Sequence, residues 1–370
     1  MGRETLSLLV LNPLERGAWG GVERWLFDLS LSLRDRGHRV ASAGCPESAW
    51  SQRMDEAGFP VCRIPLRTDF GLAQARTLAA FMREHAVEVV ATKLHRGIRA
   101  AGFAARLAGR PSVVAFMGLV ETRPGWRYAM TYRLFLDRVV TLSDAMRDEI
   151  ARLGGLDPSI VSTIPYGVRP HEYEVPDAEG LAVRRDLGIA ADAPVVLAIG
   201  RLHLQKRFDL LLHAFAKVRE ALPRARLLVA GQGRLLPELD ALRRRLGLDA
   251  SAALLGFRRD VPRLLSAADC LAMSSDFEGL PMVALEAAAT GRPVVATEVG
   301  SIAALVEDGR TGHLVPKGDV AALAARLVEV LGAPDRGRSM GAAGRARVLD
   351  RFPLSRCIEE TERFLLSVRR

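Results

Sequence analysis

The sequence predicts an α/β protein of two doubly wound, Rossmann-like domains that face a central cleft. Short apolar runs alternate with longer amphipathic segments in two series along the 370 residues, and a stretch rich in proline and charge separates the series. Strands joined by helical crossovers form parallel sheets with helices on both faces. The composition, 49% apolar and 26% charged, fits such a chain and excludes a disordered one.

The first series begins with an apolar run at 6–11, which we interpret as a buried strand rather than a leader or a membrane span. A glycine-rich loop follows it. The pattern then predicts a helix at 22–36, a strand at 39–43, a helix at 50–57, a strand at 61–64, a helix at 72–85, a strand at 87–91, a helix at 98–107, a strand at 112–116, a helix at 126–136, a strand at 138–142 and a helix from about residue 144. These elements make up a predicted N-terminal domain at 1–168.

The second series follows a predicted linker at 169–193. Its strands are expected at 195–199, 226–230, 252–255, 270–273 and 293–296, with helices between them and another at 320–331. The first of these runs is apolar without alternation, as a buried central parallel strand should be. We therefore expect a C-terminal domain at 194–352 and a final helix within 353–370.

The loops after the strands hold the candidate site, because ligands of doubly wound sheets bind beyond the carboxyl ends of the strands. In the second half, Gly200 precedes Arg201 and Lys206, two cations that can converge on one phosphate. Solvated surface charge explains the same spacing equally well. After the next strand, Gly231 and Gly233 permit close approach of the backbone to a ligand, which by itself is a weak signal.

A stronger signal lies in residues 274–289. Pro281 suits the first turn of a helix and Gly279 leaves the helix N-terminus open, so its amides and positive dipole end can face an anion. Glu286 then falls on an almost wholly apolar helix, where an ionised carboxylate needs donors such as a sugar diol. The alternative is an exposed glutamate on a polar helix face, which its Ala, Leu, Val and Met neighbours disfavour.

Several motifs in a fixed order resemble the retaining GT-B glycosyltransferases of family four (glycosyl transferases group 1), and the resemblance covers nearly the whole chain. The matching segments lie at 20–23, 164–168, 200–206, 231–233, 255–257, 278–286, 291–296 and 307–312. Individually several are weak, but their order and spacing together are specific. Three positions depart from the family pattern: Tyr166 replaces the common Asn, Arg169 the frequent Asp, and Arg207 the usual Gly.

The resemblance implies an enzyme that moves a sugar, with retention, from a nucleoside diphosphate sugar to a glycan or lipid-linked acceptor in bacterial-type surface polysaccharide or lipopolysaccharide assembly. No cofactor and no metal ion are expected, in agreement with a sequence that lacks a D-x-D motif. The alternative is a non-catalytic pseudo-glycosyltransferase or partner subunit that binds a sugar nucleotide. A nicotinamide-dependent oxidoreductase is disfavoured because no G-x-G-x-x-G follows the first strand.

The resemblance also implies that the domain at 1–168 binds the acceptor, that the domain at 194–352 binds the nucleotide sugar, and that the final helix within 353–370 crosses back to the N-terminal domain. It further implies roles for individual residues. Arg201 and Lys206 would hold the donor diphosphate and stabilise the charge that develops on it, while Glu278 would bind the donor sugar and Glu286 the ribose. The remaining donor contacts would come from Gly20 and Gly21 in the first half, from Gly200, Gly231 and Gly233, from Phe257 and Arg258 beside the base, and from Gly279, Leu280, Pro281 and Met282 at the helix N-terminus.

His95 matches the position of an active-site histidine in many relatives. Its residue type and place after a strand, taken alone, favour a structural or exposed loop histidine. With the resemblance we expect it to contact the donor sugar or the acceptor, and we assign no enzymatic nucleophile.

The charge balance raises the question of an anionic partner, since 52 Lys and Arg outnumber 43 Asp and Glu and leave a net charge of +9. Eight basic residues between Lys93 and Arg133 face a single acid, and Trp126, Tyr128, Met130 and Tyr132 lie among them. This segment predicts an acceptor-binding or membrane-facing patch, although helices that merely expose arginines would look the same. We expect a cytoplasmic protein on the inner face of the membrane, no nucleic-acid partner, and four reduced cysteines.

Overall fold

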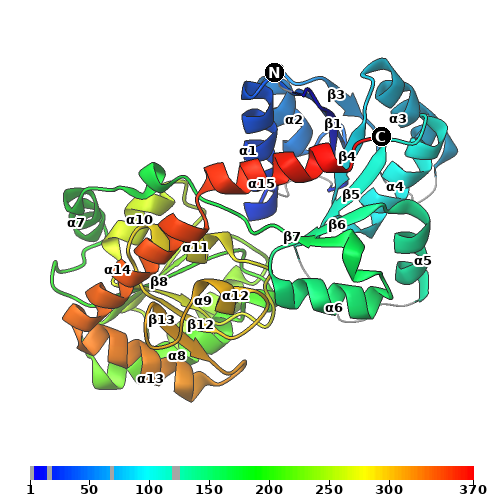
Figure 1. Cartoon of the computed structure of the whole chain (residues 1–370). Coiled ribbons are helices and arrows are strands. Elements are labelled where there is room, and N and C mark those ends of the chain that lie inside the picture. The colour runs from blue at the N-terminus through cyan, green and yellow to red at the C-terminus, as the bar shows by residue number, and fades with distance from the viewer. Residues whose placement is uncertain (1–3, 15–18, 67–70, 119–125) are drawn as a thin grey trace. The chain divides into compact units, whose positions relative to one another are not determined.

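The computed structural model describes residues 4–14, 19–66, 71–118 and 126–370 (Figure 1). The chain divides into two compact units: the first contains residues 1–166 and 355–370, and the second contains residues 167–354. Each unit is built on one parallel sheet. No helix in the described ranges is long and apolar enough to cross a membrane.

The sheet of the first unit has the order β3-β2-β1-β4-β5-β6-β7, and all its strands are parallel. The strands are β1 (Ser7–Asn12), β2 (Arg39–Gly44), β3 (Val61–Arg63), β4 (Val89–Thr92), β5 (Ser112–Phe116), β6 (Arg138–Thr141) and β7 (Val161–Thr163). The strand order reverses between β1 and β4, so a crevice for a ligand is expected where these two strands end. The sequence pattern missed β7, because three residues are too short to show a period.

The helices of the first unit are α1 (Gly21–Asp35), α2 (Ala49–Glu56), α3 (Leu72–Glu84), α4 (Leu94–Leu107), α5 (Trp126–Phe135), α6 (Asp144–Gly154) and α15 (Leu354–Ser367). Helices α3 and α4 cover one face of the sheet, where Leu78 and Ala104 belong to one apolar core with Leu9 and Val90. The N-terminus of α4 lies four residues before its predicted start, because Lys93 and not the later apolar run caps the helix.

The last helix, α15, completes the first unit (Figure 1). The Trp25 indole donates to the Cys357 sulfur at 3.3 Å, and the Cys357 thiol donates to the carbonyl of Pro165 at 2.9 Å. The sequence prediction also placed this helix there. All four cysteines are buried thiols that form no disulfide.

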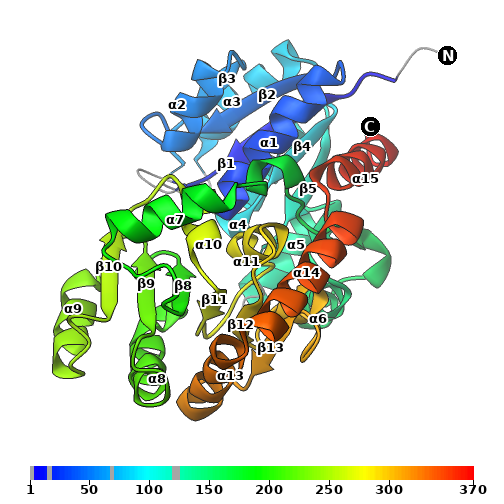
Figure 2. The ribbon, with the colours of Figure 1, turned by 90° about the vertical axis from the view of Figure 1, so that its left-hand side faces the viewer.

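The sheet of the second unit has the order β10-β9-β8-β11-β12-β13, again parallel throughout (Figure 2). The strands are β8 (Val195–Ile199), β9 (Arg226–Ala230), β10 (Ala252–Gly256), β11 (Cys270–Met273), β12 (Val294–Thr297) and β13 (Gly312–Val315). Helices α8 (Phe208–Ala221), α9 (Leu236–Arg245) and α13 (Val320–Gly332) share one apolar core with this sheet. The remaining α-helices are α7 (Asp177–Asp186), α10 (Val261–Ala267), α11 (Met282–Ala289), α12 (Ile302–Leu305) and α14 (Pro334–Arg351).

The predicted linker at 169–193 is an integral part of the second unit. It contains α7, which packs against α10 so closely that a Cβ on Gly180 would overlap the main chain at Ser266. From the same helix the buried Arg184 donates to the carbonyls of Ala267 and Ala193 and forms an ion pair of 3.0 Å with Asp269. Proline and mixed charge suggested a linker, whereas here the charges anchor a helix.

Candidate functional site

The strand order of the second sheet reverses between β8 and β11, so the loops after these strands lie together at one edge. Gly200 follows β8, and Ser274 follows β11. The β8 loop continues through a short 3₁₀ turn, Leu204–Lys206, into α8, while the β11 loop continues into α11. Both loops carry the residues that the sequence singled out.

Lys206 and Glu278 meet at this edge. The Lys206 ammonium lies 2.5 Å from Oε1 of Glu278, and their side chains are only 18% and 7% exposed. The Ser275 hydroxyl donates to the same oxygen at 2.6 Å. A Cβ on Gly200 would lie 3.2 Å from the Lys206 side chain, so the glycine leaves room for the lysine side chain. The pair is thus a largely buried cation and anion that mutually neutralise each other.

Arg201 adjoins this pair in sequence but differs from it in environment. Its side chain is exposed, and no described acidic residue forms an ion pair with it. The β8 loop therefore presents one cation that is already neutralised and one that is available to an anion.

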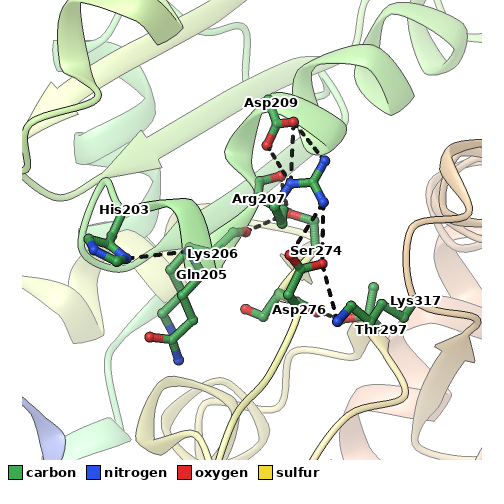
Figure 3. A network of polar contacts seen from close by, with 10 residues as sticks. His203, Gln205, Lys206, Arg207, Asp209, Ser274, Asp276, Thr297 and Lys317 are labelled. Carbon is green, nitrogen blue, oxygen red and sulfur yellow. Dashed lines mark hydrogen bonds and ion pairs between the residues drawn. The ribbon is translucent and has the colours of Figure 1, made fainter. Parts of the chain in front are cut away.

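Main-chain contacts join the two loops. The Asp276 amide donates to the carbonyl of Gln205 at 2.8 Å, and the Gln205 side chain donates to the carbonyl of Phe277 at 2.8 Å. The Ser274 hydroxyl donates to the carbonyls of Lys206 and Arg207 (Figure 3). These contacts set the position of Lys206 relative to Glu278.

Arg207, which departs from the family glycine, has φ +47° and ψ 44°. This left-handed conformation costs a non-glycine residue about 1 kcal/mol or more. Its guanidinium donates to Asp209 at 3.0 Å and to Asp276 at 3.3 Å (Figure 3). Hydrogen bonding to Asp209 is the main reason that the pKa of Arg207 is raised. The loop keeps the backbone that a glycine would adopt and gains an ion-pair network.

The glycines after β9 make room for the main chain of the β8 loop. A Cβ on Gly231 would overlap the carbonyl oxygen of Gly200, and one on Gly233 would overlap that of Leu202. The Leu202 amide donates to the carbonyl of Gln232 at 2.9 Å. That the loop after β9 also approaches a ligand closely stays a prediction. In the structure, its glycines allow it to pack closely against the β8 loop.

Glu286 lies on α11 and is buried, with only 8% of its surface exposed. The hydroxyl of Tyr173, from the turn Pro170–Tyr173, donates to its Oε1 at 3.0 Å. Burial agrees with the expectation from its apolar neighbours. Sequence reasoning missed Tyr173, because that residue lies in the segment interpreted as a linker.

The other predicted donor contacts lie at the same sheet edge. Phe257 follows β10 with 60% of its surface exposed, whereas Arg258 forms a forked ion pair with Asp260 at 2.5 and 2.8 Å. The hydrogen bonds from Arg258 lower the pKa of Asp260. Gly279, Leu280 and Pro281 are buried just before α11, and Met282 is its first residue.

A cavity of about 660 Å³ borders the β8 loop on the side of α9. Its apolar lining includes Leu204, Phe208, Leu239 and Phe277. Gln205 and Arg207 contribute its polar edge, whereas Lys206 and Glu278 do not line it. The cavity is therefore separate from the ion pair.

In the first unit the candidate residues lie where β1 and β4 end. Gly20 caps α1, and its amide donates to the Glu23 carboxylate at 2.9 Å. Glu23 forms an ion pair with Lys93, the capping residue of α4, and both side chains are less than a tenth exposed. Gly21 is the first residue of α1. The ion pair thus connects the N-terminus of α1, next to Gly20, with the N-terminus of α4, next to His95.

His95 lies in the first turn of α4, rather than in an exposed loop, and is 6% exposed. Its Nε2 is 3.2 Å from the hydroxyl of Tyr132 on α5, and the two rings lie 5.0 Å apart. The sequence analysis assigned Tyr132 to a surface patch. The only signal that could have paired these residues is the adjacency of β4 and β5, which brings α4 and α5 together.

The predicted basic patch at 93–133 is smaller than its residue count suggests. Lys93 is buried in an ion pair, Tyr132 is buried against His95, and Arg99 hydrogen-bonds to Thr131 at 3.3 Å. Lys93 and Tyr132 are therefore not part of an exposed patch, and Arg99 is partly buried. Arg110, Met130 and Arg133 are exposed. Arg123 and the side chains of Trp126, Arg127 and Tyr128 lie outside the described residues.

Tyr166 and Arg169, two of the departures from the family pattern, lie on either side of the boundary between the units and have different environments. Tyr166 is 2% exposed and packs on Trp25 at 4.8 Å between ring centroids, and burial raises its pKa. Arg169 forms an ion pair of 3.2 Å with Glu172. Within the described ranges, no group of three or more His, Cys, Asp or Glu side chains is arranged to hold a metal ion.

Comparison with known proteins gives the family. A model described as glycosyl transferases group 1 matches residues 193–333, and one described as glycosyltransferase family 4 matches residues 19–172. The GDP-mannose-dependent alpha-(1-6)-phosphatidylinositol monomannoside mannosyltransferase of Mycolicibacterium smegmatis is 30% identical over 82% of this chain and 83% of that protein. The chain belongs to glycosyltransferase family 4.

Other curated relatives of this family-4 chain match over a shorter region. D-inositol 3-phosphate glycosyltransferase 2 of Catenulispora acidiphila is 37% identical over 55% of this chain, and the match covers 50% of that protein. The chain thus spans about half the length of several of the curated relatives that it matches.

Solved structures show the same fold. Anabaena HepE in complex with UDP superposes with a TM-score of 0.86 at 22% identity, covering 98% of this chain and all of HepE. A glycosyltransferase of Rickettsia africae superposes with a TM-score of 0.87 at 17% identity, covering 98% of both chains. The family-4 chain therefore has the GT-B fold of two Rossmann-like units.

Proposed function

We propose that this family-4 protein transfers a sugar, with retention and without a metal ion, from a nucleoside diphosphate sugar to a glycan or lipid-linked acceptor. The observation that carries the proposal is the Lys206–Glu278 pair at the switch point of the second sheet, with the exposed Arg201 in the same loop. A cation, a sugar-binding carboxylate and a second available cation are the groups that such a donor requires.

Arg201 and Lys206 bind the diphosphate in this proposal. Negative charge grows on the diphosphate as the glycosyl bond breaks, and fixed cations stabilise that charge more in the transition state than in the ground state. The donor anion competes with Glu278 for the Lys206 ammonium. Glu278 is then free to accept hydrogen bonds from the donor sugar, while the Ser275 hydroxyl keeps its Oε1 in place.

Glu286 binds the ribose hydroxyls, since a carboxylate accepts from both members of a diol. Phe257, exposed at the end of β10, flanks the base. The amides of the α11 N-terminus, from Gly279 to Met282, contact the sugar or phosphate. The relatives support this class of donor, because HepE was crystallised with UDP-glucose and the Mycolicibacterium relative is named for GDP-mannose.

In the first unit, Gly20 and Gly21 approach the donor diphosphate and His95 contacts the donor sugar or the acceptor. The Tyr132 hydroxyl fixes the imidazole by its contact with Nε2. We assign the acceptor to bacterial-type surface polysaccharide or lipopolysaccharide assembly, at the cytoplasmic side of the membrane.

The exposed Arg110, Met130 and Arg133 would contact anionic lipid, and co-sedimentation with phosphatidylglycerol vesicles at low salt tests this contact.

Incubation with UDP-, GDP-, ADP- and TDP-sugars tests the activity. We expect one donor to raise the melting temperature and to be hydrolysed slowly to the nucleoside diphosphate without acceptor, with retained anomeric configuration by NMR and no loss of rate in EDTA. Lys206→Ala should lower kcat/KM for that donor about tenfold to a hundredfold, because a charge-assisted contact is lost. Lys217→Ala, at an exposed lysine of α8, is the matched control. Neither hydrolysis nor stabilisation by any donor would contradict the proposal.

A further inference from the structure

Arg207 lies at the end of the β8 loop, and its side chain contacts the β11 loop; these two loops carry Lys206 and Glu278. It follows Lys206 directly and ends the 3₁₀ turn, and its own backbone begins α8. Its conformation is the left-handed one that glycine adopts without strain. An arginine that keeps this conformation needs a compensating interaction of its side chain.

The compensation is a fork between two carboxylates, that of Asp209 in the first turn of α8 and that of Asp276 in the β11 loop. Nε and one terminal nitrogen donate to Asp209 at 3.1 and 3.0 Å, and the other terminal nitrogen donates to both oxygens of Asp276 at 3.3 Å (Figure 3). The Lys317 ammonium lies 3.8 Å from Asp276 as well. Each nitrogen of the guanidinium thus points to a carboxylate.

Asp276 lies two residues before Glu278, and Arg207 lies one residue after Lys206. The Arg207–Asp276 contact therefore bridges the segments that carry the two members of the Lys206–Glu278 pair. It adds to the hydrogen bonds of Ser274 and Gln205, which bridge the same segments through the main chain. Thr297 holds the far side of the β11 loop through the Ser275 carbonyl.

We infer that Arg207 is a positioning residue: it holds the Lys206 loop against the Asp276–Glu278 segment and so sets the separation of the phosphate-binding cation and the sugar-binding carboxylate. The inference rests on the proposed function. A direct role of Arg207 as a third phosphate-binding cation is disfavoured, because its three nitrogens are directed to Asp209 and Asp276.

The test compares Arg207→Gly, Asp276→Asn and their double variant in the full chain. Arg207→Gly removes the fork while retaining the backbone conformation, so its melting temperature should stay close to that of the parent. We expect each single variant to lower kcat/KM for the donor about fivefold to tenfold, and the double variant to be no worse than either, because both remove one contact. Arg207→Lys, which keeps the charge without the fork, should recover only part of the loss.

Lys206→Ala separates failure of this inference from failure of the proposed function. Full activity of Lys206→Ala would overturn both. A severe loss in Lys206→Ala with unchanged kcat/KM in Arg207→Gly would overturn the inference alone. Tighter binding of UDP or GDP by Asp276→Asn, measured by calorimetry, would also overturn it, because that result would assign Arg207 to the phosphates with Asp276 as its competitor.

Discussion

Glu286 is buried inside the second unit, and its carboxylate accepts a hydrogen bond from the Tyr173 hydroxyl. Tyr166 has the opposite environment: its hydroxyl is buried and has no hydrogen-bond partner among the described residues. Both tyrosines are at most 3% exposed. The difference in stability between a paired and an unpaired buried hydroxyl can therefore be measured within one protein.

We expect Tyr173→Phe to lower the free energy of unfolding by about 1–3 kcal/mol and to weaken donor binding, because Glu286 loses a donor. Tyr166→Phe removes a hydroxyl that no partner satisfies, so it should leave stability unchanged or increase it. Urea unfolding of both variants, with donor affinity by calorimetry, makes the comparison. Equal destabilisation by the two substitutions would contradict this account.

At the scale of elements, the site is an edge at which four loops of the second unit pack against one another in pairs. The glycines after β9 admit the main chain of the β8 loop, and Gly300 after β12 admits that of the β11 loop, since a Cβ there would overlap the carbonyl of Glu278. The Ser301 amide donates to the carbonyl of Gly279 at 2.9 Å. Loops packed in this way hold side chains in fixed places before a ligand binds.

Gly231→Ala should destabilise the second unit by more than about 2 kcal/mol and lower donor affinity, because the methyl group collides with the Gly200 carbonyl. Gly247→Ala is the matched control: it also has a positive φ, of +66°, but has nothing within 4 Å. Its cost should be limited to the left-handed backbone, about 1 kcal/mol. Thermal unfolding with and without UDP or GDP distinguishes the two; equal losses would refute the packing role of Gly231.

At the scale of the whole molecule, the chain leaves the first unit at residue 166 and returns to it at residue 355. The return is secured by His38, whose Nδ1 accepts from the Leu6 amide at 3.0 Å and whose Nε2 therefore donates to Glu362 of α15 at 2.7 Å. Arg36 also pairs with Glu362 at 2.7 Å. His38 and Arg36 thus converge on one carboxylate of α15.

Desolvation by burial is the largest single influence on the pKa of Glu362, and it raises that pKa. The hydrogen bond from His38 and the charge of Arg36 together outweigh desolvation, so the pKa of Glu362 lies below its usual 4.5. A depressed pKa in the folded state contributes stability above the unfolded pKa that is lost as the pH falls through the folded value. Glu362→Gln should therefore destabilise the first unit at pH 7 and progressively less below pH about 4.5. Tryptophan fluorescence during urea unfolding reports this loss, because all four tryptophans belong to the first unit. The exposed Glu359→Gln on the same helix is the control, and a pH-independent cost of Glu362→Gln would contradict the assignment.

The local pattern of apolar residues predicted the two parallel sheets well, because a strand buried on both faces must be apolar whatever surrounds it. Strand β8 and strand β5 have the predicted bounds. The strands β7 and β13 and the helix α7 were missed. Neither Val161–Thr163 nor Gly312–Val315 is a continuous apolar run, and α7 is anchored by the buried Arg184 rather than by an apolar stripe. The family motifs likewise marked Lys206, Glu278 and Glu286 as candidates before their contacts were known.

The sequence by itself thus determined the fold class, the family and the candidate side chains, because these follow from local periodicity and from the order of short motifs. Only the tertiary structure decided the partners of those side chains: Glu278 for Lys206, Tyr173 for Glu286, Tyr132 for His95 and Glu23 for Lys93. It also decided that the glycines after β9 accommodate a neighbouring loop and that Arg207 bridges two segments. Such contacts join residues that are distant in the chain, and their geometry depends on the packing of several elements, which no local pattern contains.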